Sequence, residues 1–301
     1  MRIGVAATPS VALPVLNWLA SSSHELACVI TQPDRPSGRG QEISASPVAK
    51  WAIENGIHLL RPESPYDLVG RVEDLDCVIT IGYGILLPEE ILTLPRQGFL
   101  NLHFSLLPAY RGAAPVQRAI ENGETITGVT VFALDKGMDT GPIYTSAQLA
   151  IDPTWRTGEL MEALAQMGPD VVEAALTAIA NGVKPQKQVG ISSTAPKISK
   201  KEAEINWSQS ADEILRKIRA FYPAPGAWST WDGAGFKLTR AKISQGELSI
   251  GEIAIIDGDV VVGCGYKSAL SLVSVVPAGK KEMKAVDWAR GARLSPGAHF
   301  G

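Results

Sequence analysis

Short apolar runs alternate with amphipathic stretches through the first half of the chain. The runs are residues 3–6, 26–31, 77–81 and 99–105. Strands that alternate with helical patterns are typical of βαβ units, which form parallel sheets. Residues 128–134 and 143–151 predict two further strands, and residues 157–181 predict one long helix that ends at Gly182. The pattern therefore predicts an α/β fold over residues 1–185, built on a doubly wound, mostly parallel sheet.

The pattern changes after residue 185. Residues 186–206 are polar and rich in proline, serine, threonine and lysine, which predicts an interdomain linker. Residues 211–221 predict a short amphipathic helix, and short strands follow it. Dipeptides that form tight turns separate these strands, namely Asp232-Gly233, Gln245-Gly246 and Asp257-Gly258. A run of short strands with tight turns predicts a smaller β-barrel domain over residues 207–301.

One predicted strand carries polar side chains where a buried strand should be apolar. Side chains alternate between the two faces of a strand, so Asn101, His103 and Ser105 share one face of the run 99–105. Burying three polar groups costs free energy unless they have partners or a use. Pro108 ends the strand, which leaves His103 near its carboxyl end, where open α/β sheets bind their ligands. These residues are the first candidates for a functional site.

Composition and charge narrow the class of protein. Hydrophobic residues make up 45% of the chain and charged residues 20%, and no apolar run approaches the roughly 20 residues that span a bilayer. The chain opens directly into a strand-like run without a signal-peptide pattern, so we expect a cytoplasmic protein without a membrane segment. From Lys187 onward there are 16 basic and 11 acidic side chains, although the net charge of the whole chain is −3. This excess is compatible with a polyanionic partner.

No metal site can be assembled from the histidines and cysteines of the sequence. Cys28, Cys77 and Cys264 are isolated within apolar runs, which predicts buried reduced thiols rather than disulfides or metal ligands. The four histidines include no pair spaced three or four residues apart. We therefore expect no bound metal.

Asp139, in the loop 137–141, adds a carboxylate to the amide of Asn101 and the imidazole of His103. The chain lacks a Gly-x-Gly-x-x-Gly turn after its first strand, a Walker motif and a Gly-x-Ser-x-Gly elbow. An amide, a neutral imidazole and a carboxylate suit acyl transfer to an amine that the substrate supplies. The amide donates to the oxyanion, the imidazole takes the proton of the amine, and the carboxylate sets the imidazole tautomer. Taken singly, His103 also fits a core histidine, and Asn101 and Asp139 fit turn residues.

The run Asn-x-His-x-Ser-Leu-Leu-Pro at residues 101–108 resembles the core motif of the folate-dependent formyltransferases. The resemblance continues through residues 110–120, 128–130 and the loop 135–141. It implies the formyltransferase fold, 10-formyltetrahydrofolate as formyl donor, and catalytic roles for Asn101, His103 and Asp139. It also implies a folate pocket formed by Ser105, Leu106, Leu107, Pro108, Gly82, Tyr83, Gly84, Ile85, Leu87, Asp135 and Gly137.

Three distant segments resemble those family members that formylate the methionyl group of initiator tRNA. They are the loop 31–40 and the segments 197–207 and 277–283. The resemblance implies transfer of a formyl group to the α-amine of methionyl-initiator tRNA, and an OB-like carboxyl-terminal barrel that lies along the tRNA. It implies tRNA contacts by Arg35, Arg39, Lys200, Lys201, Lys280 and Lys281. We expect a monomer.

Two other functions stay open at this point. A folate-dependent formyltransferase of the same family that acts on an amino-sugar nucleotide would work without tRNA. Alternatively, the barrel would bind RNA while the α/β domain serves as a scaffold without catalysis. Replacing His103 separates catalysis from binding, and a comparison of acceptors separates the two transferases.

Overall fold

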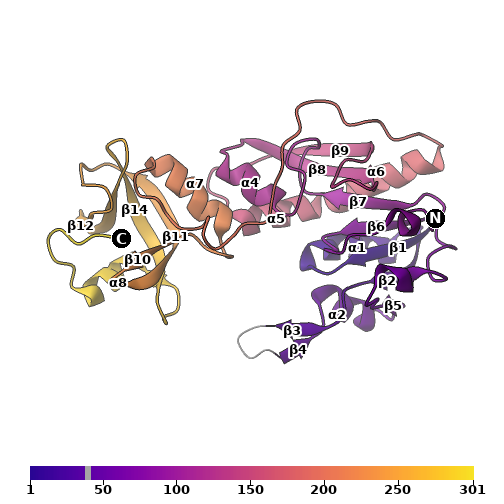
Figure 1. Cartoon of the computed structure of the whole chain (residues 1–301), viewed down its shortest axis with the longest axis horizontal. Coiled ribbons are helices and arrows are strands. Elements are labelled where there is room, and N and C mark those ends of the chain that lie inside the picture. Colours follow the sequence, from indigo (N-terminus) through magenta and orange to yellow (C-terminus); the bar gives the residue numbers. More distant parts are fainter. Residues whose placement is uncertain (38–41) are drawn as a thin grey trace. The chain divides into compact units, whose positions relative to one another are not determined.

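The computed structural model describes residues 1–37 and 42–301, and the chain divides into two compact units. Unit 1 consists of Met1–Gly112, Ile126–Ala150 and Met161–Thr194, and unit 2 of Ala113–Thr125, Ile151–Leu160 and Ala195–Gly301. Each unit has its own sheet, indigo to magenta in unit 1 and orange to yellow in unit 2 (Figure 1). The chain leaves unit 1 for the last time after Thr194, inside the polar segment 186–206.

Unit 1 is built on a seven-stranded sheet with the strand order β5-β2-β1-β6-β7-β8-β9. The strands are β1 (Arg2–Ala7), β2 (Glu25–Ile30), β5 (Leu59–Leu60), β6 (Cys77–Ile81), β7 (Phe99–His103), β8 (Ile126–Ala133) and β9 (Ile143–Ala150). The first five strands of that order are parallel, whereas β8 and β9 run antiparallel to their neighbours. The predicted doubly wound, mostly parallel sheet is confirmed. All five residues of β6 are buried, which accounts for its apolar sequence around Thr80.

Helices and a small ribbon complete unit 1. Helix α1 (Leu13–Ser21) packs against α6 (Gly168–Ala180), and α2 (Pro47–Glu54) contacts β2 and β5. Helix α2 begins after Ser46, whose hydroxyl accepts a hydrogen bond from the Ala49 N–H at 3.0 Å. The shorter elements are η1 (Ser10–Ala12), η2 (Pro65–Leu68), α3 (Glu89–Leu92) and the antiparallel pair β3 (Arg35–Ser37) and β4 (Glu42–Ser44).

The single helix predicted over residues 157–181 is wrong, because the segment forms two helices. Helix α5 (Thr157–Gln166) ends before Met167, and α6 begins at Gly168. Pro169 follows in the first turn of α6, and a proline has no N–H to donate to the preceding turn. A Cβ on Gly168 would lie 2.8 Å from Val15 and 3.0 Å from Leu102, so the break also permits a close approach of the backbone.

Strand β7 ends at His103 rather than at Ser105, so the predicted strand 99–105 was too long. Ser105 Oγ donates to Ala109 O at 2.6 Å, and Ser105 O accepts from Thr130 Oγ1 at 2.7 Å. These bonds hold a turn that begins after the strand. Ser105 is therefore part of that turn and does not extend the polar face of β7.

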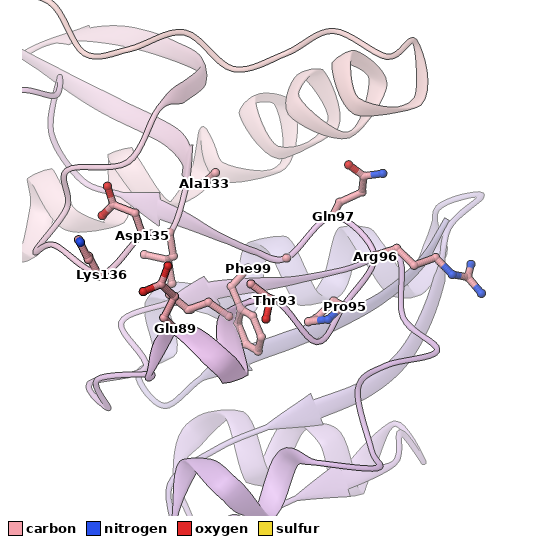
Figure 2. A pocket seen from close by; sticks show the side chains of 12 residues that line it. Glu89, Thr93, Pro95, Arg96, Gln97, Phe99, Ala133, Asp135 and Lys136 are labelled. Carbon is pink, nitrogen blue, oxygen red and sulfur yellow. The ribbon is translucent and has the colours of Figure 1, made fainter.

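A cavity of about 540 Å³ lies in unit 1 near the amino-terminal end of β7 (Figure 2). Figure 2 shows Asp135 and Lys136 at one side of it, Arg96 and Gln97 at the other, and Phe99 between them. Its volume falls within the range of roughly 300–1,000 Å³ that is typical of small-molecule sites.

Unit 2 is built on a six-stranded antiparallel sheet. Its pairing runs β10-β11-β14-β13-β12, and β15 pairs with β14. The strands are β10 (Trp228–Trp231), β11 (Ala234–Ser244), β12 (Ile253–Ile256), β13 (Asp259–Cys264), β14 (Ser268–Pro277) and β15 (Met283–Lys284). The turns Asp232-Gly233 and Asp257-Gly258 join β10 to β11 and β12 to β13, and all four residues have positive φ, as type I′ hairpins require. The β architecture predicted for the carboxyl-terminal region is confirmed.

Three helices belong to unit 2. Helix α7 (Ala211–Phe221) has the predicted bounds and packs against α4 (Pro115–Glu121) and β11, while α8 (Ala285–Ala292) packs against β14. A capping box fixes the start of α7, because Ser210 and Glu213 exchange side-chain and backbone hydrogen bonds. Across the described ranges, no helix is both long enough and apolar enough to span a bilayer.

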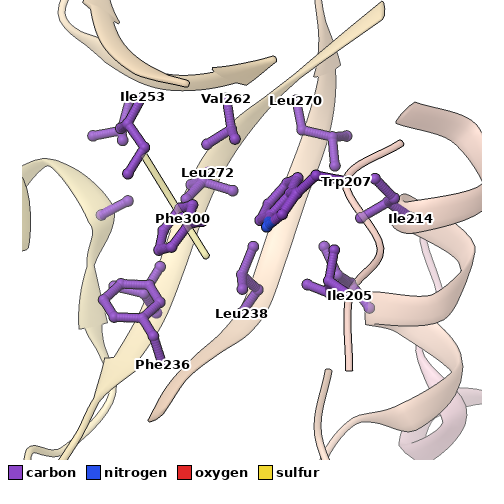
Figure 3. Close-up of a cluster of buried hydrophobic side chains, with 14 of the residues drawn as sticks. Ile205, Trp207, Ile214, Phe236, Leu238, Ile253, Val262, Leu270, Leu272 and Phe300 are labelled. Atoms are coloured by element: carbon purple, nitrogen blue, oxygen red, sulfur yellow. The ribbon is translucent and has the colours of Figure 1, made fainter. Parts of the chain in front are cut away.

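The core of unit 2 is rich in aromatic side chains (Figure 3). Trp207 and Phe300 stack with their ring centroids 5.3 Å apart and an interplanar angle of 11°. The indole N–H of Trp207 donates to Ser229 Oγ at 3.0 Å, so this buried donor is satisfied. Figure 3 shows Ile214 of α7 and Leu270 of β14 beside Trp207. The helix and the sheet therefore share one core.

Ile253→Ala should destabilise unit 2 by about 2–5 kcal/mol, because truncation of this core side chain, which is 3% exposed, leaves a cavity. Ile255 lies on the same strand but is 54% exposed, and Ile255→Ala should change the free energy of unfolding by less than about 0.5 kcal/mol. Urea unfolding followed by tryptophan fluorescence measures both changes. Equal losses in the two variants would contradict the orientation of β12.

Candidate active site

Two neighbouring strands fix the position of β7. Strand β6 places Thr80 beside Asn101, and β8 places Thr130 beside His103. Asn101 and His103 are two residues apart on β7, so their side chains leave the same face of the sheet. Phe99 lies on this face too and lines the cavity of Figure 2. Phe99 at the cavity, Asn101 and His103 therefore lie in that order along one face of β7.

His103 is 6% exposed, and the surroundings of both ring nitrogens are defined. Nε2 lies 2.9 Å from Tyr110 O, and because a carbonyl only accepts, the proton is on Nε2. Nδ1 then carries a lone pair and lies 3.7 Å from Asp139 Oδ2. Burial lowers the pKa of His103 below its ordinary value of 6.5, although Asp139 and the Tyr110 carbonyl oppose this shift. The imidazole is therefore neutral at pH 7, and Nδ1 is free to accept a proton.

Asp139 lies on a loop, and backbone and side-chain hydrogen bonds hold it in place. Its Oδ2 accepts from the Gly112 N–H at 2.7 Å, and its carbonyl accepts from Gln188 Nε2 at 2.8 Å. Asp139 has a φ of +54°, a conformation that costs a non-glycine residue free energy and persists only where the surroundings hold it. The carboxylate is thereby fixed on the Nδ1 side of His103, where its charge favours the imidazolium form.

The amide of Asn101 is oriented by Thr80. Thr80 Oγ1 lies 2.8 Å from Asn101 Oδ1 and 3.0 Å from Leu100 O, and these two oxygens share its single O–H donor. With Oδ1 facing the hydroxyl, Asn101 Nδ2 faces away from Thr80 with its two N–H donors. Such a donor suits a negatively charged oxygen that develops during a reaction.

Asp135 is the predicted folate residue that lines the cavity. Its Oδ1 accepts from the Gly137 N–H at 3.0 Å and from Thr140 Oγ1 at 2.7 Å. These two bonds stiffen the loop between Asp135 and Asp139. One loop therefore joins the cavity wall to the carboxylate beside His103.

The other predicted folate residues lie in two further loops of unit 1. Gly82 and Gly84 both have positive φ, and the carbonyl of Tyr83 between them accepts from Gln32 Nε2 at 2.7 Å. Tyr83 and Leu87 are buried in a hydrophobic cluster against which Ile85 packs. In the turn after β7, Leu107 and Ser105 are buried, and Leu106 and Pro108 are half-buried. Tyr83, Leu87 and Ile85 therefore contribute to the hydrophobic core of unit 1 in addition to any contact with a ligand.

The predicted tRNA residues lie apart in the sequence. Arg35 opens β3, where it pairs with Ser44, and Arg39 lies outside the described residues. Lys200, Lys201, Lys280 and Lys281 all belong to unit 2 and are exposed. The Lys200 ammonium lies 5.9 Å from the Trp228 ring centroid, and the Trp228 indole N–H donates to Lys200 O at 2.8 Å.

Sequence reasoning missed three residues that shape the site, namely Thr80, Tyr110 and Gln188. Thr80 gives a weak signal, since it is the polar residue in an otherwise apolar strand. The role of Tyr110 depends on its backbone carbonyl, which no side-chain pattern reveals. Gln188 bonds to residues 49 and 77 positions earlier, so its role has no local signal.

The described part of the chain holds no group of three His, Cys, Asp or Glu side chains that could bind a metal ion. All three cysteines are buried and free. Burial raises the pKa of Cys77 and of Cys264 to about 12 and that of Cys28 to about 11. The thiols are therefore protonated at neutral pH and are poor nucleophiles.

Asp139→Asn should lower the pKa of His103 further, because the Asp139 charge is what raises it against burial. Asp135→Asn is the matched control, since Asp135 lies in the same loop but bonds to Gly137 and Thr140. NMR titration of the imidazole resonances measures the pKa in each variant. A higher His103 pKa in Asp139→Asn than in the unmodified protein would contradict this electrostatic arrangement.

Comparisons with known proteins agree over both parts of the chain. A formyl transferase model matches residues 1–176, and a formyl transferase C-terminal domain model matches residues 197–293. A methionyl-tRNA formyltransferase of a Nocardioides species is 45% identical over 100% of this chain and 98% of its own, and that of Salinispora tropica is 42% identical over 99% of each. The solved N-formyltransferase from Helicobacter canadensis has a similar fold, with a TM-score of 0.68 and 18% identity over 90% of this chain and 98% of its own. The chain belongs to the formyl transferase family.

Proposed function

We propose that this protein transfers the formyl group of 10-formyltetrahydrofolate to the α-amine of methionine on initiator tRNA. The observation that carries the proposal is a neutral, buried His103 whose Nδ1 faces Asp139, on the same strand face as Asn101. Identity of 42–45% over nearly the full length to proteins named methionyl-tRNA formyltransferase supports the acceptor. An acceptor that starts translation also supports a cytoplasmic location.

The three side chains divide the chemistry of formyl transfer. The free amine attacks the formyl carbon, so a C–N bond forms while the bond from that carbon to the donor nitrogen breaks. His103 takes the proton of the amine on Nδ1 and returns it to the leaving nitrogen, and Asp139 stabilises the imidazolium between these steps. Asn101 Nδ2 donates to the oxygen that becomes negatively charged, a contribution worth about 10²–10³ in rate.

The cavity beside Phe99 is a candidate site for part of the formyl donor, whose ring is flat and polar. Leu92, Phe99 and Leu134 supply apolar walls, and Asp135 supplies a carboxylate that can orient ring N–H groups. Phe99 is two residues from Asn101 on one strand face, which supports placing the donor beside the catalytic candidates. The other residues of the proposed folate pocket do not line this cavity, and they are Gly82, Tyr83, Gly84, Ile85, Leu87, Ser105, Leu106, Leu107, Pro108 and Gly137.

The alternatives have less support. The Helicobacter canadensis N-formyltransferase was solved with folinic acid and dTDP-3-aminofucose, but its 18% identity to this chain supports a common fold alone. The relatives named methionyl-tRNA formyltransferase match over the whole chain at more than twice that identity. A noncatalytic RNA-binding role leaves the arrangement of Asn101, the buried His103 and Asp139 without a use.

A formylation assay with one donor and three acceptors tests the proposal. We expect initiator Met-tRNA to be formylated faster than elongator Met-tRNA, and an amino-sugar nucleotide not to react. His103→Ala should lower kcat by about 10²–10⁴, because it removes the general base. His58→Ala replaces an exposed histidine elsewhere in unit 1 and should leave the rate unchanged. Faster formylation of the sugar nucleotide, or an active His103→Ala variant, would refute the assignment.

Arg35, Arg39, Lys200, Lys201, Lys280 and Lys281 are the proposed tRNA contacts. Replacing the four lysines by alanine should flatten the dependence of log Kd on log salt by roughly 0.7–0.9 for each phosphate that a lysine no longer neutralises. Lys184→Ala removes an exposed lysine of unit 1 that is not among these residues and should leave the slope unchanged. An unaltered slope in the four-lysine variant would exclude these lysines as phosphate-binding residues.

A further inference from the structure

Gln188, which follows α6 in unit 1, makes four hydrogen bonds with one side chain. Its Nε2 donates to Asp139 O and to Gly141 O, both at 2.8 Å. Its Oε1 accepts from Arg111 Nη2 at 2.6 Å and from Arg111 Nε at 3.1 Å. A carboxamide has two N–H donors and two acceptor lone pairs, so every hydrogen-bonding position of this amide is used. If the amide were rotated by 180°, its oxygen would face the two carbonyls and its N–H groups would face the guanidinium. Only one orientation of the amide therefore fits.

The partners of Gln188 are the two segments that surround the His103 ring. On one side, Gln188 holds the backbone of Asp139, whose carboxylate faces Nδ1. On the other side, it holds Arg111, which lies between Tyr110 and Gly112. The Tyr110 carbonyl accepts from Nε2, and the Gly112 N–H donates to Asp139. One amide therefore joins the segments that set the tautomer and the charge environment of the imidazole.

Residues 186–194, named the strap here, are anchored at both ends by backbone contacts within unit 1. At the first end, the N–H and carbonyl of Gln186 pair with Ile143, at 2.8 and 2.7 Å. At the second end, Ser193 Oγ accepts from the Tyr110 N–H and Ser193 O accepts from the Arg111 N–H, both at 2.9 Å. Gln188 lies between these two anchors. The anchors therefore fix its position independently of its own bonds to the Asp139 loop.

We propose that Gln188, acting with Arg111, is a positioning residue that sets the placement of Asp139 relative to His103. This inference rests on the proposed function of His103 and Asp139 as the proton-transfer pair. The need for such a residue follows from geometry: His103 is fixed by a strand, whereas Asp139 sits in a loop at positive φ. Loops are less rigid than central strands, and a displacement of about 1 Å in a reacting group can cost about 10²-fold in rate.

Two substitutions of Gln188 test the proposal. Gln188→Ala removes all four bonds, whereas Gln188→Glu keeps acceptors for Arg111 and loses both donors to the loop. We expect kcat for formylation of initiator Met-tRNA to fall by about 10²-fold in each variant, with the Kd for tRNA unchanged. We also expect the ring-nitrogen resonances of His103 to shift in spectra of the free protein. His103→Ala assigns these resonances among the four histidines.

Gln186→Ala is the matched control, because Gln186 is exposed and joins the strap through its backbone. It should match the unmodified protein in kcat and in the His103 resonances. Unchanged His103 resonances or unchanged kcat in a folded Gln188 variant would overturn the proposal. Thermal unfolding identifies folded variants, and Gln188→Glu decides the matter if Gln188→Ala does not fold. If the unmodified protein fails to formylate any acceptor, the proposed function fails, while the His103 resonances still report whether Gln188 positions Asp139.

Discussion

One hydrogen bond determines what the site can do, and it joins His103 Nε2 to the Tyr110 carbonyl. A neutral imidazole has a single proton, so committing it to Nε2 leaves Nδ1 as the basic nitrogen. Several contacts within unit 1 position the two partners of this hydrogen bond. The pairing of β7 with β6 and β8 sets the depth of the ring, and Tyr110, with a φ of +62°, is held by the Ser193 hydroxyl. Burial then keeps the ring uncharged until a proton arrives.

The site combines parts of different rigidity. Asn101 and His103 stand on a buried central strand, where neighbouring strands allow little movement. Asp139 stands on a loop whose turn is closed by Asp135, and its carboxylate is fixed by the Gly112 N–H. This division is common in α/β folds, where the sheet holds some groups and the loops at strand ends bring others to them. The carboxylate is therefore the part of the pair that depends most on side-chain hydrogen bonds.

The sequence alone predicted the architecture because its signals are periodic and local. The apolar strands, the helix 211–221 and the Asp-Gly hairpins were all identified from short patterns, and the structure has them. The errors have local causes too: Pro169 divides the predicted long helix, and Ser105 turns away to bond to Ala109. Alternation predicted the shared face of Asn101 and His103. Thr80 and Gln188 escaped prediction because strand register and loop closure depend on distant residues.

The strap also affects the stage of folding at which the site is completed. Gln188 bonds to residues 49 and 77 positions earlier in the chain, so these bonds form only after the strap itself has been synthesised and docked. The sheet and α6 precede the strap in the chain and hold its first anchor at β9. A newly made chain would thus gain its secondary structure before it gains a properly placed carboxylate. Recovered activity is therefore a stricter measure of complete folding in unit 1 than recovered helix and strand content.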